Sequence, residues 1–249
     1  MKRRIVCLLL LLCLTGCSAS RQEQVIVFAA ASLEETLTEI GSQYMVLHDD
    51  VELIFNFDSS GTLLTQIEEG APCDLFLSAG QKQMNNLSEI PLQRINLLEN
   101  KVVLAVPDGN PDEVTSFSSL KEKLEAGTIL LAIGNSDVPV GQYTQKILNW
   151  LELDEQHLAQ NGQITYGSNA REVTLQVTEG AVSCGIVYAT DARSAGLTVV
   201  DTATESMCGQ VLYPAAVLQP SEAAQAFFEY LQSGASDAVF SSVGFTPLG

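Results

Sequence analysis

Short apolar runs that end in a turn and lead into a helical pattern repeat along most of this chain. Residues 25–29 form the first run, and apolar side chains then recur at helical spacing from Leu33 to Leu47. The same unit recurs at residues 51–69 and at residues 164–178. Alternation of strands and helices predicts an α/β fold with mostly parallel sheets.

The predicted elements fall into two groups along the chain. Further strands are expected at residues 73–77, 101–106, 129–133, 185–188, 197–200 and 211–217, and further helices at residues 81–87, 120–125, 140–151, 223–232 and 238–243. Strand–turn–helix units lie on both sides of extended segments near Val103 and Tyr213. We therefore expect two lobes, residues 25–103 with 213–249 and residues 104–212, that enclose a ligand cleft and close about the two crossings.

The first sixteen residues are predicted to be a signal peptide. Three basic residues at positions 2–4 precede an apolar stretch, residues 5–14, that is too short to span a membrane. The following Leu14-Thr15-Gly16-Cys17 is similar to the bacterial lipobox, which predicts lipidation at Cys17 and a tether over residues 17–24. The alternative is an ordinary cleaved signal peptide with a chance cysteine. Lipidation would hold the mature protein on the outer side of the cell membrane.

The charge balance limits the partners of the chain. Removal of the signal peptide takes away Lys2, Arg3 and Arg4 and no acidic residue, so the formal charge changes from −18 to −21. Such a charge argues against nucleic acid as a partner and against electrostatic attraction of the protein to anionic lipid.

Three cysteines, Cys73, Cys184 and Cys208, remain in the mature chain, and none belongs to a metal-binding spacing. An odd number leaves at least one of them unpaired. Cys73 and Cys184 lie in apolar strands, where a cysteine is usually a small buried hydrophobe. A bridge between Cys184 and Cys208 stays open.

Two serine-containing turns, at Ser32 and Ser60, stand where a strand ends and a helix begins. A helix N-terminus offers free N–H groups and is a ready anion site. The alternative is capping: Ser32 and Glu35 fit a capping box, and Ser60 could cap a helix that begins at Thr62. Asp58 should point away from an anion or act as a cap.

The second half of the chain offers similar donors. Pro139 suits a first helical turn, which would leave the amides of Val140 and Gly141 unpaired. Another helix opens after Gly167, with Ser168 or Asn169 as its cap. Arg171 is expected to be solvated or to form a salt bridge between the lobes. Tyr188 ends a buried strand, either as an edge of the core or as a hydroxyl donor to the cleft.

Together these motifs identify a family resemblance. They are Phe28-Ala-Ala-Ala-Ser-Leu33, Ser59-Ser60 with Thr62-Leu63 and Gln66-Ile67-Glu68, Gly70-Ala-Pro-Cys-Asp-Leu-Phe76, Val138-Pro139, Gly185-Ile-Val-Tyr188 and Gly244-Phe245-Thr246. Their order and spacing resemble those of the molybdate-binding proteins of ABC transporters. The resemblance runs from about Val25 to Phe245. It implies a type II periplasmic-binding-protein architecture with two Rossmann-like lobes.

The resemblance also implies a function and a site. The protein would be a monomeric, membrane-anchored binding protein that captures molybdate or tungstate, needs no cofactor and delivers the anion to an ABC permease. The family's two serines, two backbone amides and tyrosine hydroxyl correspond to Ser32, Ser60, Val140, Ala170 and Tyr188. These groups would hold the oxyanion, with no separate site for a metal cation. Gly61 stands where a serine is common in the family.

Three other interpretations are considered at this point. One is a sulfate-, phosphate- or other oxyanion-binding relative of the same fold, or a metal-binding one, and another is a membrane-tethered sensor domain. The third is a serine hydrolase, which would need a base. His48 follows a helix beside two aspartates, His157 lies in a polar stretch, and neither accompanies a G-x-S-x-G turn. The sequence therefore predicts a binding protein and no enzyme.

Overall fold

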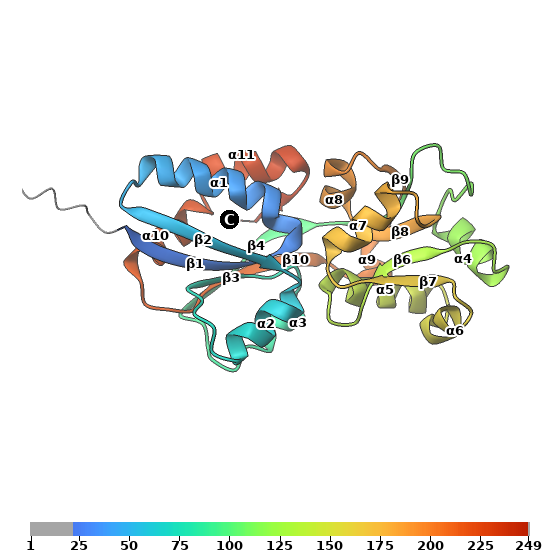
Figure 1. The fold of residues 1–249 in the computed structure, drawn as a ribbon, viewed down its shortest axis with the longest axis horizontal. Helices are drawn as coiled ribbons and strands as arrows, with labels where there is room; N and C mark the ends of the chain where they lie inside the picture. Colours follow the sequence, from blue (N-terminus) through green and yellow to red (C-terminus); the bar gives the residue numbers. More distant parts are fainter. Residues whose placement is uncertain (1–21, 249) are drawn as a thin grey trace, which may run out of the picture.

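A computed structural model describes residues 22–248. It shows two α/β lobes side by side (Figure 1). Lobe 1 is built on a six-stranded sheet in the order β11-β4-β10-β3-β1-β2, and lobe 2 on a five-stranded sheet in the order β7-β6-β8-β5-β9. The predicted fold class, two α/β lobes, is confirmed.

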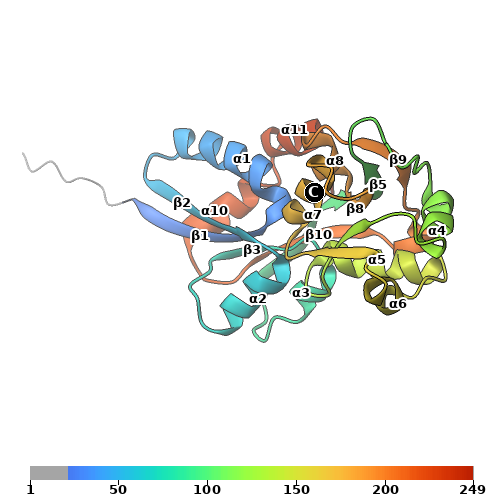
Figure 2. The same cartoon turned by 45° about the vertical axis from the view of Figure 1, so that its right-hand side comes forward.

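Lobe 1 carries helices on both faces of its sheet. Its strands are β1 (Glu23–Ala30), β2 (Val51–Asp58), β3 (Leu75–Leu77), β4 (Gln93–Asn100), β10 (Val211–Val217) and β11 (Thr246–Pro247). Its helices are the 3-10 turn η1 (Ala31–Leu33), α1 (Glu34–Leu47), α2 (Ser60–Glu68), α3 (Gln81–Asn85), α10 (Glu222–Tyr230) and α11 (Gly234–Val243). Helices α1, α10 and α11 cover one face, and α2 and α3 the other (Figures 1 and 2).

Lobe 2 repeats this layered arrangement. Its strands are β5 (Val102–Val106), β6 (Leu131–Gly134), β7 (Ile164–Gly167), β8 (Cys184–Tyr188) and β9 (Thr198–Thr202). Its helices are α4 (Phe117–Glu125), α5 (Pro139–Trp150), α6 (Glu155–Gln160), α7 (Ala170–Thr178), α8 (Ala189–Ser194) and α9 (Glu205–Cys208). Val173 and Val177 of α7 pack on one face of the sheet, against Val103 and Ala132.

Both sheets are mixed, so the expectation of mostly parallel sheets is wrong. Strand β1 runs parallel to β2 and β3, but β10 runs antiparallel to β3 and β4. In lobe 2, β6 is parallel to β7 and β8, whereas β5 is antiparallel to β8 and β9. The antiparallel strands β4, β5 and β10 adjoin the two crossings: β4 leads out of lobe 1, whereas β5 and β10 enter their sheets from the neighbouring lobe.

The chain passes between the lobes at Lys101, between β4 and β5, and again between α9 and β10. The expected division is shifted by two residues at each crossing. Val102 and Val103 pair in the sheet of lobe 2, and Val211 and Leu212 pair in the sheet of lobe 1. The sequence interrupts its apolar runs close to both crossings, at Glu99-Asn100-Lys101 and at Gly209-Gln210, and these breaks mark the observed boundaries better than the expected ones do.

Several elements were not expected, namely the eight-residue strand β4 and the short elements α6, α8, α9 and β11. Strand β4 exposes Gln93 and Arg94 and has no regular alternation, since it is buried mainly at its C-terminal half. Helix α2 begins at Ser60 instead of Thr62, and α4 begins at Phe117 instead of Leu120, because the capping side chains are Ser59 and Ser116.

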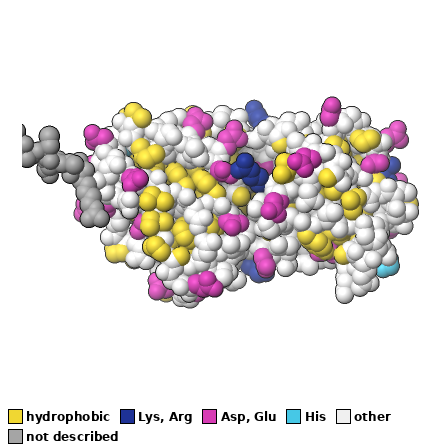
Figure 3. All heavy atoms as spheres, viewed as in Figure 1, with side chains coloured by type: hydrophobic (Ala, Val, Ile, Leu, Met, Phe, Trp, Pro, Cys, Tyr) yellow, Lys and Arg dark blue, Asp and Glu magenta, His cyan; other side chains and the backbone are white. Residues whose placement is uncertain are grey.

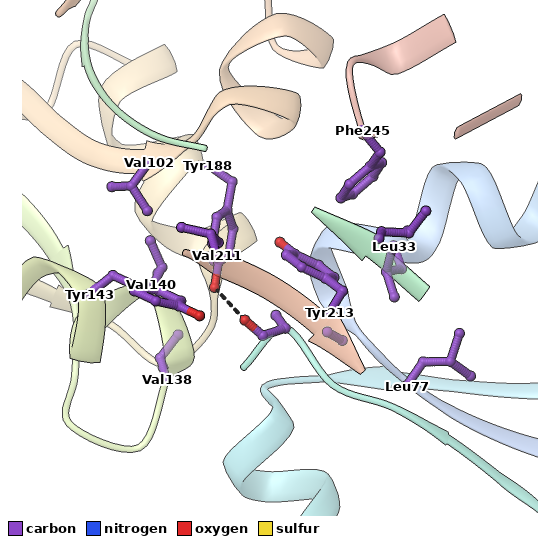
Figure 4. Close-up of a cluster of buried hydrophobic side chains, with 14 of the residues drawn as sticks. Leu33, Leu77, Val102, Val138, Val140, Tyr143, Tyr188, Val211, Tyr213 and Phe245 are labelled. Carbon is purple, nitrogen blue, oxygen red and sulfur yellow. Dashed lines mark hydrogen bonds between the residues drawn. The ribbon is translucent and has the colours of Figure 1, made fainter. Parts of the chain in front are cut away.

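Buried apolar side chains form one continuous cluster across the junction of the lobes. Leu33 and Tyr213 of lobe 1 belong to the same cluster as Val140 and Tyr188 of lobe 2 (Figure 4). The rings of Tyr188 and Tyr213 meet edge to face with their centroids 5.5 Å apart. The lobes are therefore packed directly against each other at their inner ends.

Cys73, Cys184 and Cys208 are buried and unbridged, so the possible bridge between Cys184 and Cys208 is not formed. Burial raises the pKa of the Cys73 and Cys184 thiols to about 12, which makes them unreactive at neutral pH. Between residues 22 and 248, no helix is long and apolar enough to cross a bilayer. The predicted signal peptide and Cys17 lie outside the described residues.

Candidate functional site

The N-termini of three helices, α2, α5 and α7, lie at the junction of the lobes. A β-carbon on Gly80 of lobe 1 would lie 3.1 Å from the Cβ of Pro139, the first residue of α5. Helix α7 contacts η1, which contains Ser32. Free amides and helix dipoles at these ends make the junction favourable to negative charge.

Ser32 is held by lobe 1 at this junction. Its Oγ lies 3.0 Å from Oη of Tyr213. The predicted capping box is wrong, because Ser32 lies inside η1 and the residue that precedes α1 is Leu33, which makes no side-chain cap. The Ser32 hydroxyl is thus directed to the junction and not to its own helix.

Ser60 is the first residue of α2, so the cap considered for it lies instead at the preceding residue, Ser59. Ser59 Oγ accepts the capping bond from the Thr62 amide at 3.1 Å. Ser60 is fully buried, and its Oγ accepts a bond from the Ala79 amide at 3.0 Å. Asp58 does not cap α2: its Oδ1 accepts from the amide of the adjacent Ser59 at 2.6 Å, and Ser59 is the cap.

Tyr188 reaches across from lobe 2. Its buried hydroxyl donates to the carbonyl of Ala79 at 3.2 Å (Figure 4). Burial raises the pKa of Tyr188 well above its ordinary value, so the phenol keeps its hydrogen at neutral pH. Since Ala79 bonds both Ser60 and Tyr188, the structure brings these two predicted residues together through one peptide segment.

Val140 and Ala170 are buried residues in the first turns of α5 and α7. Helix geometry leaves their amides without an acceptor inside the helix. Asn169 is the cap of α7, with its Oδ1 accepting from the Glu172 amide at 2.9 Å, which settles the choice between Ser168 and Asn169.

Gly61 permits the close approach of the two lobes. A β-carbon at this position would lie 2.4 Å from the backbone oxygen of Asp137, in the loop that leads to α5. Nε2 of Gln83, from lobe 1, lies 3.5 Å from the same oxygen. The absence of a side chain at Gly61 is therefore required for this packing of the lobes.

Arg171 forms an ion pair with Glu34, between α7 of lobe 2 and α1 of lobe 1. This agrees with the expected salt bridge between the lobes. Both side chains are substantially exposed, so the contribution of the pair to stability is small. Acidic side chains are scattered over this side of both lobes, and the basic ones seen there lie mostly near the junction (Figure 3).

Sequence reasoning missed the polar residues behind the junction. Asn100 Nδ2 donates to Oγ1 of Thr190 at 3.0 Å and to Oη of Tyr213 at 3.2 Å, and all three residues are buried. Asp191, in the first turn of α8, has a buried Oδ2 that finds no hydrogen-bond partner among residues 22–248. A polar residue inside an apolar run, as at Tyr213, is the sequence pattern that could have indicated this network.

The site chemistry is that of uncharged donors. Two serine hydroxyls, a tyrosine hydroxyl and helix-terminal amides surround the junction, and such groups suit a ligand that only accepts hydrogen bonds. Over residues 22–248, no cluster of three or more His, Cys, Asp or Glu side chains could hold a metal ion. His48 stacks on Tyr44 at the end of α1, and His157 is exposed on α6.

The chain matches a family model for bacterial extracellular solute-binding proteins over residues 25–246. It is 33% identical to YvgL of Bacillus subtilis, whose name describes a substrate-binding lipoprotein of an ABC transporter, over 97% of this chain and 96% of YvgL. It is 33% identical to the molybdate-binding protein ModA of Escherichia coli K12, over 93% of this chain and 92% of ModA.

Among solved structures, the periplasmic molybdate-binding protein of Azotobacter vinelandii superposes with a TM-score of 0.76. The superposition covers 89% of this chain and 98% of that protein at 19% identity. At this identity the likeness establishes the two-lobed fold and nothing more.

Replacement of Asp191 by asparagine should stabilise the protein in a pH-dependent way. Burial raises the pKa of this carboxyl from 3.8 to about 7. The unfolded chain loses the proton near pH 4 and the folded chain near pH 7, so Asp191 increasingly lowers stability as the pH rises across this window. Raising the pKa from 3.8 to about 7 lowers stability by about 4 kcal/mol at pH 8. Asp191→Asn should therefore raise Tm by roughly 10 °C at pH 8 and by little at pH 4, because 1 kcal/mol shifts Tm by about 2–4 °C in a domain of this size.

Thermal unfolding followed by circular dichroism at pH 4, 6 and 8 measures this effect. Asp108→Asn removes an exposed carboxylate and is the matched control. An equal change in Tm at all three pH values would contradict the assignment.

Proposed function

The chain belongs to the family of bacterial extracellular solute-binding proteins, and we propose that it captures molybdate, and also tungstate, for an ABC permease. Ser32, Ser60 and Tyr188 would donate hydroxyl hydrogens to the anion, and Val140 and Ala170 their backbone amides. The observation that carries the proposal is the convergence of three helix N-termini and three hydroxyl-bearing side chains at one inter-lobe junction. The names of the curated relatives support molybdate as the ligand.

A strongly acidic protein can bind a dianion by this arrangement. Charge-assisted bonds from neutral N–H and O–H groups are short and strong, and helix dipoles add positive potential. Surface carboxylates are screened over about 10 Å at ordinary salt. The formal charge, −18 for the full sequence and −21 after removal of Lys2, Arg3 and Arg4, would slow the encounter with the anion without preventing tight binding.

Selectivity would follow from the size of the cage and from its lack of acceptors. A cage spaced for a larger tetrahedral anion leaves sulfate with stretched bonds and unsatisfied donors. Protonated phosphate carries an O–H that needs an acceptor. Molybdate and tungstate have nearly equal size, so the cage would take both. Sulfate is the second candidate ligand within this family.

Binding would be coupled to a hinge motion. The two lobes would move about Lys101 and the segment between α9 and β10, where the chain crosses between the sheets. The Tyr188 hydroxyl is bonded to Ala79 when the lobes are packed together, so it would exchange this bond for one to the anion. The closed pair of lobes would then present one continuous surface to the permease.

We further propose that the mature protein is a monomeric lipoprotein attached through Cys17. The residues before Cys17 have the pattern of a lipoprotein signal peptide, and the name of YvgL describes a lipoprotein. The family is one of binding proteins, so the chain is not an enzyme and the serine hydrolase interpretation is set aside.

Loss of both cage serines should abolish tight binding. Each hydroxyl bond to a charged group contributes about 1.5–3 kcal/mol, so Ser32→Ala/Ser60→Ala should weaken molybdate binding at least about a hundredfold. Calorimetric titration with molybdate, tungstate and sulfate measures this. Wild-type protein should bind the first two with similar affinity and sulfate far more weakly.

The control is Ser42→Ala/Ser118→Ala, which removes two exposed serines. Unchanged binding by the cage variant would refute the site, whereas equal binding of sulfate and molybdate by the wild type would refute selection by size.

A side chain at Gly61 should prevent closure. Its β-carbon would lie 2.4 Å from the Asp137 carbonyl oxygen, which is backbone and cannot move aside cheaply. With saturating molybdate, small-angle scattering should give a smaller radius of gyration for the wild type and no decrease for Gly61→Ala. Gly234→Ala is the control, since a β-carbon there meets nothing within 4 Å. Equal compaction of both variants would contradict the closure mechanism.

Replacement of Cys17 should release the protein from the membrane. In cells that process lipoproteins, the wild type should partition into the detergent phase of a Triton X-114 extract and Cys17→Ala into the aqueous phase. Ser18→Ala should behave as the wild type. A Cys17→Ala protein that stayed with the detergent would exclude this residue as the anchor.

A further inference from the structure

We propose that Tyr213 is a positioning residue for the anion site: it donates its phenol hydrogen to Ser32 Oγ and thereby leaves the Ser32 hydroxyl hydrogen for the bound oxyanion. The proposal rests on the function proposed above. It assigns to Tyr213 and Asn100, which do not belong to the five-residue cage, a role in deciding which way the Ser32 hydrogen points.

The orientation of the Asn100 amide is fixed by the backbone at the crossing between the lobes. Asn100 Oδ1 accepts a bond from the Lys101 amide at 2.8 Å. Because a backbone N–H can only donate, the oxygen of the side-chain amide must face Lys101. The nitrogen therefore faces Thr190 Oγ1 and Tyr213 Oη, at 3.0 Å and 3.2 Å.

The direction of the next bond follows from this orientation. Tyr213 Oη accepts a hydrogen from Asn100, so the phenol's own hydrogen needs a different acceptor. Ser32 Oγ, 3.0 Å away, is the other atom among residues 22–248 that meets hydrogen-bond geometry with Tyr213 Oη. The neighbouring Tyr188 hydroxyl interacts with Tyr213 as well, but its geometric bond is the one that it donates to the Ala79 carbonyl. If Ser32 donated instead, the phenol hydrogen of Tyr213, which is 1% exposed, would lack a well-placed acceptor. Burial also raises the pKa of Tyr213 well above its ordinary value, which keeps the phenol protonated.

The two cage serines are then held in the same way. Ser60 Oγ accepts a bond from the Ala79 amide, and Ser32 Oγ accepts one from the Tyr213 hydroxyl. In both serines, Oγ accepts a hydrogen bond from the protein, and the hydroxyl hydrogen remains free to be donated. An oxyanion without protons needs donors only, so both serines are prepared for it before it arrives.

A double-mutant cycle tests whether Tyr213 acts through Ser32. Tyr213→Phe keeps the ring and removes the hydroxyl, and it should weaken molybdate binding about tenfold. In the Ser32→Ala background, the same change should alter the affinity less than about twofold, because the group that Tyr213 positions is gone. Tyr143→Phe is the control, since the ring of Tyr143 also packs edge to face on Tyr188 but its hydroxyl makes no bond to Ser32. Its effect on affinity should be the same with and without Ser32.

The outcomes separate this inference from the proposed function. All variants are titrated with molybdate, tungstate and sulfate, so the cycle is read with whichever anion binds. If the wild type binds the anion and the effects of Tyr213→Phe and Ser32→Ala on affinity are additive, the role of Tyr213 is overturned and the proposed function stands. A wild type that bound none of the three would overturn the proposed function and this inference with it.

A measurement on the unaltered protein covers the case in which Tyr213→Phe fails to fold. Neutron diffraction from deuterium-exchanged crystals locates the hydroxyl deuterium of Tyr213. Its position on the line to Ser32 Oγ would support the proposal. A deuterium on Ser32 directed to Tyr213 Oη would refute it.

Discussion

The hydrogen bond between the Tyr188 hydroxyl and the Ala79 carbonyl joins the two lobes beside Ser60, at the junction that the helix N-termini surround. The amide of Ala79 is bonded to Ser60, so one peptide segment positions groups from both lobes. A buried polar group without a hydrogen-bond partner is costly. The peptide segment at Ala79 therefore favours the arrangement in which its amide bonds Ser60 and its carbonyl bonds Tyr188. Gly61 permits that arrangement by letting the Asp137 loop approach the first turn of α2.

The apolar cluster beneath the junction explains how uncharged donors can be effective there. Leu33, Val140, Tyr188 and Tyr213 belong to a continuous core that excludes water from the inner ends of the lobes. Hydrogen bonds and helix dipoles act more strongly in such surroundings than in water. The same surroundings penalise an ionised group without a partner, as the raised pKa of Asp191 illustrates. The junction therefore combines a low local dielectric constant with many oriented donors.

Much of the fold follows from patterns within the chain, and the failures have a common cause. Helical spacing predicted α1, α5 and α7, and apolar runs predicted β1, β2 and β8. Strand β4 was missed because its burial has no regular alternation. The antiparallel directions of β5 in lobe 2 and of β10 in lobe 1 were missed because they depend on how the chain enters each sheet at the crossings. Local patterns contain no information on that direction.

The sequence by itself determined the turns that contain Ser32 and Ser60 and, within one residue, the start of α5, because each depends on residues close together in the chain. The order of strand–turn–helix units along the chain determined the two-lobed α/β class. Only the tertiary structure decided what the hydroxyls do. Ser32 meets Tyr213 across 181 positions, and Tyr188 meets Ala79 across 109. Local rules offered a cap as the alternative for both serines, yet groups distant in the chain bind them, since the folded lobe 1 brings Tyr213 and the Ala79 amide to oxygens that their own helices leave free.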